Sequence, residues 1–157
     1  MNQSLFSPLG RSFRGVMAGA IAVTALNAGV ATAQTAPPSN QVYRPIPLPA
    51  SNEITDTLTD KDIPTGVGGF SRDYAVELKE GDQVVMDLTS DQFDTILTLI
   101  GPDGATISEN DDGPDGTTNS LLFSRISRSG TYIVRVAPYA GQGLGSFTLK
   151  VSRLRPI

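Results

Sequence analysis

The amino-acid sequence predicts an all-β protein, an antiparallel sandwich of about seven or eight strands. Three observations support this fold class. From about residue 53 onward, short apolar runs recur roughly every 8 to 12 residues, turn-forming residues separate them, and no helical period follows residue 33. Such even spacing of short strands is typical of sandwiches and barrels.

Residues 1–33 have the organisation of a cleavable signal peptide. Two arginines precede an apolar stretch of small residues at 16–30, and the sequence Ala-Thr-Ala at 31–33 is typical of a signal peptidase site. The apolar stretch is too short to span a bilayer. We therefore expect a secreted or periplasmic protein that begins at Gln34 and has no membrane span after cleavage.

Residues 34–52 are expected to form a linker, because five prolines between positions 37 and 49 favour an extended chain. The domain would then occupy residues 53–157. Loss of the two signal-peptide arginines leaves 10 basic and 16 acidic residues, a net charge of −6. Such an acidic protein is not suited to nucleic acid or to anionic membranes, which bind basic surfaces.

The domain sequence divides into strand-like runs at 74–78, 84–88, 93–100, 105–108, 120–126, 132–136 and 147–151. The tetrapeptide at 101–104, Gly-Pro-Asp-Gly, predicts a tight turn between two of them. Period-two alternation predicts that the following side chains mostly point inward: Val76, Leu78, Val84, Leu97, Leu99, Ile107, Tyr132, Val134 and Val136. Tyr139 is expected to be exposed, and Arg135 to lie on a solvated outer face.

Histidine and cysteine are both missing from the whole chain. Their absence excludes disulfides, thiolate nucleophiles, Ser-His-Asp catalysis and zinc sites that use either residue. Only carboxylate chemistry would remain for an enzyme. We therefore expect no catalytic activity.

The order of motifs resembles the bacterial pre-peptidase C-terminal domain. The resemblance rests on Phe-Asp-Thr-Ile-Leu-Thr-Leu at 93–99, Pro-Asp-Gly at 102–104, Asn-Asp-Asp-Gly at 110–113, and Ser-Gly-Thr-Tyr-Ile-Val-Arg-Val at 129–136. It covers roughly residues 68–152. It implies a jelly-roll-like sandwich that accompanies secreted peptidases as a non-catalytic accessory or binding module.

One acidic segment could bind a metal ion. If the turn centres on residues 102–103, Asp94 lies opposite Asp111, or opposite Asp112 after a shift of one residue. Several carboxylates at one loop edge repel one another, and Ca²⁺ prefers such oxygen ligands. The candidate calcium ligands are Asp94, Asn110, Asp111, Asp112 and Asp115. The alternative is a loop of solvated turn-forming residues.

The sequence leaves three functions open. The leading hypothesis is a binding or accessory module, stabilised by calcium, with an extracellular protein or polysaccharide as partner. The alternative is a free-standing carbohydrate- or matrix-binding adhesin, which would need exposed aromatic side chains on one sheet face. A glycosidase using an aspartate pair is a distant third, because nothing in the sequence indicates a raised carboxyl pKa.

Overall fold

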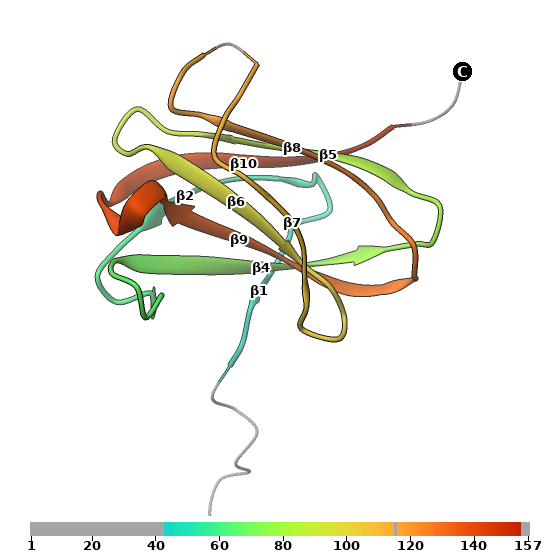
Figure 1. Ribbon diagram of the computed structural model, residues 1–157. Helices are drawn as coiled ribbons and strands as arrows, with labels where there is room; N and C mark the ends of the chain where they lie inside the picture. The colour runs from blue at the N-terminus through green and yellow to red at the C-terminus, as the bar shows by residue number, and fades with distance from the viewer. Residues whose placement is uncertain (1–42, 115, 155–157) are drawn as a thin grey trace, which may run out of the picture. The chain divides into compact units, whose positions relative to one another are not determined.

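Alternation of apolar and polar residues produces two β-sheets packed face to face (Figure 1). The computed structural model describes residues 43–114 and 116–154. The signal peptide, residues 34–42 of the expected linker and Asp115 lie outside the described residues. Within the described part, no helix is long and apolar enough to cross a membrane.

The described residues form ten strands and one short 3₁₀ helix. In chain order the strands are β1 (Ile46–Pro47), β2 (Glu53–Leu58), β3 (Ile63–Pro64), β4 (Phe70–Leu78), β5 (Gln83–Thr89), β6 (Thr95–Ile100), β7 (Thr106–Asn110), β8 (Ser120–Arg125), β9 (Gly130–Pro138) and β10 (Gly145–Leu154), with the helix η1 at Tyr139–Gly141. Eight of these strands have five or more residues, so the expected number of seven or eight agrees with the described fold.

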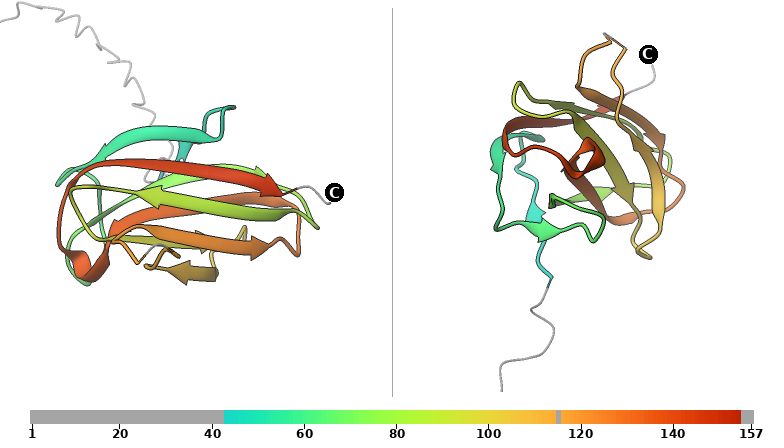
Figure 2. Two further views of the ribbon diagram at one scale, coloured as in Figure 1. Left: turned by 90° about the horizontal axis from the view of Figure 1, so that it is seen from above. Right: turned by 60° about the vertical axis from the view of Figure 1, so that its left-hand side comes forward.

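One sheet has the order β1-β4-β9-β6-β7, with β3 also paired to β4, and the other has the order β2-β10-β5-β8. All pairings are antiparallel except that of β1 with β4. Figure 2 shows the two layers from two further directions. The all-β sandwich predicted from the sequence is confirmed.

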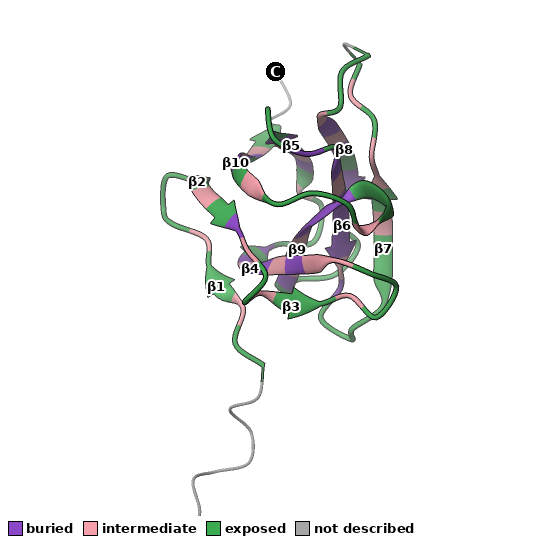
Figure 3. Cartoon of the chain, turned by 90° about the vertical axis from the view of Figure 1, so that its left-hand side faces the viewer, coloured by how far each residue is buried: buried purple, intermediate pink, exposed green. Residues whose placement is uncertain are grey.

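The inner faces of the two sheets form one apolar core (Figure 3). Tyr74, Val134 and Leu99 lie in one row across β4, β9 and β6 and are fully buried. The ring of Phe147, from the other sheet, makes an edge-to-face contact with Tyr74 at 6.2 Å between centroids. Each large apolar side chain buried in this way contributes about 1.5–3 kcal/mol to folding.

Eight of the nine side chains expected to point inward are buried, and Ile107 is not. Ile107 is 46% exposed, because the β6–β7 register shifts between Leu99 and Ile100. Ser108 pairs with Leu99 and Thr106 pairs with Ile100, so Ile107 is the extra residue of a β-bulge. The bulge interrupts the alternation on which the prediction for Ile107 was based.

Part of the proline-rich stretch contributes to the sandwich. Ile46 pairs with Tyr74 in a parallel register, and the Leu48 N–H donates to the Ala75 carbonyl at 2.8 Å. The prolines are compatible with this position because β1 is an edge strand, where a missing N–H is tolerated.

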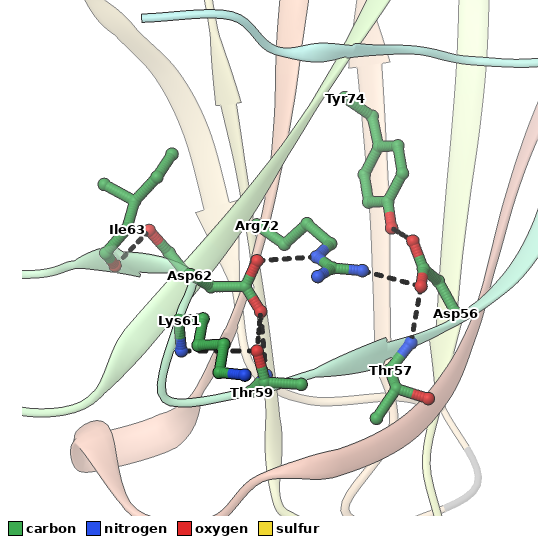
Figure 4. A network of polar contacts seen from close by, with 9 residues as sticks. Asp56, Thr57, Thr59, Lys61, Asp62, Ile63, Arg72 and Tyr74 are labelled. Atoms are coloured by element: carbon green, nitrogen blue, oxygen red, sulfur yellow. Dashed lines mark hydrogen bonds and ion pairs between the residues drawn. The ribbon is translucent and has the colours of Figure 1, made fainter. Parts of the chain in front are cut away.

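A polar network links β2, in one sheet, to β4, in the other (Figure 4). The Tyr74 hydroxyl donates to Asp56 at 2.8 Å, and the Arg72 guanidinium contacts Asp56 at 2.6 Å and Asp62 at 2.7 Å. Burial raises the pKa of Asp56, but hydrogen bonds from the Thr57 N–H, Tyr74 and Arg72 outweigh it and leave that pKa below its usual value. The network therefore ties the two sheets together where the apolar core ends.

Candidate functional site

The residues expected to bind calcium lie at one end of the β6–β7 hairpin and in the loop after it. Asn110 ends β7 and uses its amide to donate to the carbonyls of Asp112 and Leu121, at 2.6 and 2.7 Å. Asp111 is half-buried and Asp112 is exposed. Among the described residues, no three acidic side chains lie close enough together to hold a metal ion. Calcium binding at this segment stays a prediction.

The hairpin register differs from the one that placed Asp94 opposite Asp111. The ladder ends where Leu97 pairs with Asn110, so Asp94 precedes the paired part of β6. The Asp94 carbonyl instead accepts a hydrogen bond from the Tyr139 N–H, next to β9. The expected juxtaposition of Asp94 with Asp111 or Asp112 across the ladder is therefore wrong, because the turn closes between Gly101 and Ala105 and the bulge at Ile107 adds one more residue.

A groove of about 410 Å³ lies instead over the outer face of the sheet that contains β6 and β9. Its floor comes from alternate residues of β6 and β9, whose neighbours in sequence point into the core, and from Thr106 and Glu109 of β7. The β3–β4 loop and the helix η1 complete the groove. The lining residues are Thr65, Val67, Gly68, Ile96, Thr98, Ile100, Thr106, Glu109, Arg135, Ala137, Ala140 and Gly141.

One polar row crosses the floor of this groove. Asp73 pairs with Arg135, Arg135 with Thr98, and Thr98 with Glu109, on the strands β4, β9, β6 and β7. The Thr98 hydroxyl donates to Glu109 Oε2 at 2.7 Å. Ile96 and Ile100, both half-buried, lie on either side of Thr98 in β6. The floor is thus an apolar surface crossed by a row of hydrogen-bonding groups.

Arg135 is held in place by Asp73 on the neighbouring strand β4. Its Nε and one terminal nitrogen donate to the two oxygens of Asp73, both at 2.8 Å, and the Asp73 side chain has no exposed surface. Tyr43 donates to the same carboxylate at 2.5 Å. Burial and this hydrogen bond raise the pKa of Tyr43 to about 12, so the phenol stays protonated at neutral pH. Arg135 was expected on a solvated face, whereas it is half-buried and paired.

Two glycines allow the loops at one end of the groove to pack backbone against backbone. A Cβ added to Gly69 would come within 2.5 Å of the Gly141 carbonyl oxygen, and both residues have positive φ, +74° and +71°. Only glycine fits this close approach without strain. The contact positions Val67, which is 92% exposed at the tip of the β3–β4 loop.

The side chains that line the groove are mostly apolar or hydroxyl-bearing. It contains no cysteine or histidine, and its one carboxylate, Glu109, is exposed and hydrogen-bonded to a threonine. Sequence reasoning missed Val67, Thr98 and Glu109 as site residues. The only sequence signal was Asp73, Thr98 and Arg135, the polar residues that interrupt the apolar runs of β4, β6 and β9.

Comparison with known proteins identifies the domain. Residues 70–138 match the family model of the bacterial pre-peptidase C-terminal domain. No relative was found among curated protein sequences. The resemblance inferred from the motifs is confirmed over the matched residues.

Two solved structures are similar to the sandwich. One is the pre-peptidase C-terminal domain of a collagenase from Bacillus anthracis, with a TM-score of 0.53 and 11% identity. The other is PliG of Aeromonas hydrophila, a periplasmic inhibitor of g-type lysozyme, with a TM-score of 0.51 and 17% identity. Each comparison covers 69% of this chain and 95% of the other. At these identities the likeness shows the fold.

Proposed function

We propose that this chain, which carries a bacterial pre-peptidase C-terminal domain at residues 70–138, is an exported, non-catalytic module that binds a protein partner. The observation that carries the proposal is the groove over β6 and β9. It combines apolar floor residues, an exposed apolar loop tip and polar groups fixed by neighbours, which together are typical of binding sites.

The comparisons support a binding role. One similar structure is a domain of a collagenase, and the other is a periplasmic protein that inhibits a lysozyme. The second protein is named for its action on another protein. A sandwich of this architecture can therefore serve as a binding module outside the cytoplasm.

The composition of the groove favours a protein over a polysaccharide. Sugar-binding sites use exposed aromatic rings as stacking surfaces, and no aromatic residue is among the residues that line this groove. The exposed aromatic residues of the described part belong to separate elements: Tyr43 precedes β1, Phe123 lies on β8 and Tyr139 on η1. Tyr139 is 48% exposed, as expected from the sequence, but it does not line the groove.

Site-specific photo-crosslinking in the exporting cell tests the proposal. A photo-reactive benzoylphenylalanine replaces Thr106, which lines the groove, or Thr57, which is exposed on the other sheet. We expect protease-sensitive adducts from position 106 and none from position 57. Equal adducts at both positions, no adduct at position 106, or adducts that only a glycosidase removes would refute a protein-binding groove.

A further inference from the structure

We infer that the partner segment in the groove is cationic: a stretch of protein that presents Lys or Arg beside apolar side chains, with its charge against Glu109. The inference rests on the proposed protein-binding function and adds the chemistry of the partner. It follows from the balance of charge in the groove and from the apolar surface around it.

Once Asp73 is counted with Arg135, the net charge of the groove is that of one carboxylate, Glu109. Arg135 is the only cation among the residues that line it, and Asp73 already neutralises Arg135 through two hydrogen bonds. Glu109 is the only lining anion, and none of the ion pairs of the described residues involves it. Thr98 occupies Oε2 of Glu109 and thereby fixes the carboxylate, which leaves Oε1 for a partner.

Two further acidic residues lie at the end of the sheet where β6 begins and β7 ends. Asp94 directly precedes β6 and is exposed, and Asp111 directly follows β7. Neither forms an ion pair with another described residue. The negative potential of such a surface attracts a basic partner and raises its rate of association.

The apolar part of the groove suits the long stems of lysine and arginine. These side chains lay their methylene groups along apolar surface while the charged end reaches a polar partner. Ile96 and Ile100 flank Thr98 on the floor, and Val67 is exposed at one end. From Ile96 to Ile100 the strand extends about 13 Å, which is the length of four or five residues of extended chain.

Charge also favours a cationic segment over two alternative occupants of the groove, a second copy of this chain and an acidic segment. A second copy of the mature chain would carry its own net charge of −6 to the groove. An acidic segment would meet Glu109, Asp94 and Asp111 with no unpaired lining cation in return. Both are disfavoured by like-charge repulsion.

Two pentapeptides of opposite charge test the inference by nuclear magnetic resonance titration of the isotope-labelled exported protein. One probe is acetyl-Val-Lys-Val-Lys-Val-amide and the other is acetyl-Val-Glu-Val-Glu-Val-amide, both at millimolar concentration. We expect the lysine peptide to shift the amide signals of β6 and β9 at the groove, and the glutamate peptide to leave them unchanged.

The variant Glu109→Gln keeps an oxygen acceptor for Thr98 and removes the charge. We expect it to weaken binding of the lysine peptide about two- to fivefold, as for a solvent-exposed ion pair. Glu80→Gln, an equal change of charge at the exposed β4–β5 turn, should leave Kd unchanged.

Equal binding of the glutamate peptide, no shift with the lysine peptide, or an unchanged Kd for Glu109→Gln would each overturn the inference. A protein cross-link at position 106 together with failure of the lysine peptide would overturn the cationic partner alone. In that case the protein-binding function would still stand.

Discussion

Replacing Arg135 with methionine tests whether the buried Asp73 carboxylate depends on its guanidinium partner. Methionine keeps much of the apolar stem and removes the charge. The Asp73 side chain has no exposed surface, and after the change it would retain the Tyr43 hydroxyl as its remaining side-chain partner among those described. The variant therefore leaves a buried negative charge without a cation.

The expected loss of stability follows from the burial of the two partners. Removing one member of a fully buried ion pair costs about 3–5 kcal/mol. Because the Arg135 side chain is 35% exposed, water screens the pair, and we expect the lower end, about 3 kcal/mol. For a domain of this size, this corresponds to a fall in melting temperature of about 12 °C.

Differential scanning calorimetry at neutral pH measures the effect, with Arg125→Met as control. Arg125 is exposed and in no ion pair with a described residue, so its loss should change stability by less than about 0.5 kcal/mol. The double variant Asp73→Asn/Arg135→Met should be more stable than Arg135→Met alone, because the unpaired charge is gone. If Arg135→Met melts within about 2 °C of the wild type, or if the two changes are additive, the reasoning is wrong.

Four further predictions concern the core, the inter-sheet network, the metal and the leader. Leu99→Ala should lower the free energy of unfolding in urea by about 2–5 kcal/mol, whereas Ile107→Ala at the exposed bulge should change it by less than about 0.5 kcal/mol. Because the pKa of Asp56 is lowered in the fold, its stabilisation is present above about pH 4 and is lost as the pH falls through the lowered pKa; Asp56→Asn should flatten that decline in acid melts. If calcium binds, millimolar Ca²⁺ should raise the melting temperature above that in EDTA, and Asp111→Ala should abolish this difference. Equal melting temperatures of the wild type in Ca²⁺ and in EDTA would show that the acidic segment does not bind calcium. The intact mass of the exported protein should correspond to a chain that begins at Gln34; a full-length mass would contradict export by cleavage.

The strands and the core could be predicted because they depend on local sequence. Alternation identified the inward side chains of β4, β5, β6 and β9, and the Gly-Pro-Asp-Gly turn forms as expected, with the Gly104 N–H donating to the Gly101 carbonyl at 2.9 Å. Ile107 failed because a bulge adds a residue without any mark in the hydrophobic pattern. Phe123 also lies within a strand-like run, yet it is 55% exposed on β8.

The groove could not be predicted because it depends on strand register. Asp73, Arg135, Thr98 and Glu109 belong to four strands and meet only through three ladders. The register that placed Asp94 opposite Asp111 would place Thr98 opposite Ile107, since each of these residues is four positions closer to the turn. The observed register pairs Thr98 with Glu109 instead. This shift of two residues keeps every side chain of β6 on its face but exchanges an apolar neighbour for a carboxylate.

The presence of Glu109 in place of Ile107 opposite Thr98 gives this row of the outer face its negative charge. With Ile107 beside Thr98, the only charge on the floor would be that of Arg135, which Asp73 already neutralises. With Glu109 beside Thr98, the same floor carries a negative charge held by a hydrogen bond. Two features each contribute one residue to this shift: the turn closes between Gly101 and Ala105, and Ile107 is the extra residue of the bulge. Deletion of Ile107 would make the ladder regular and leave Thr98 paired with Glu109, so we expect the carboxylate, and with it the preference for a basic segment, to remain while the core residues of β6 stay buried.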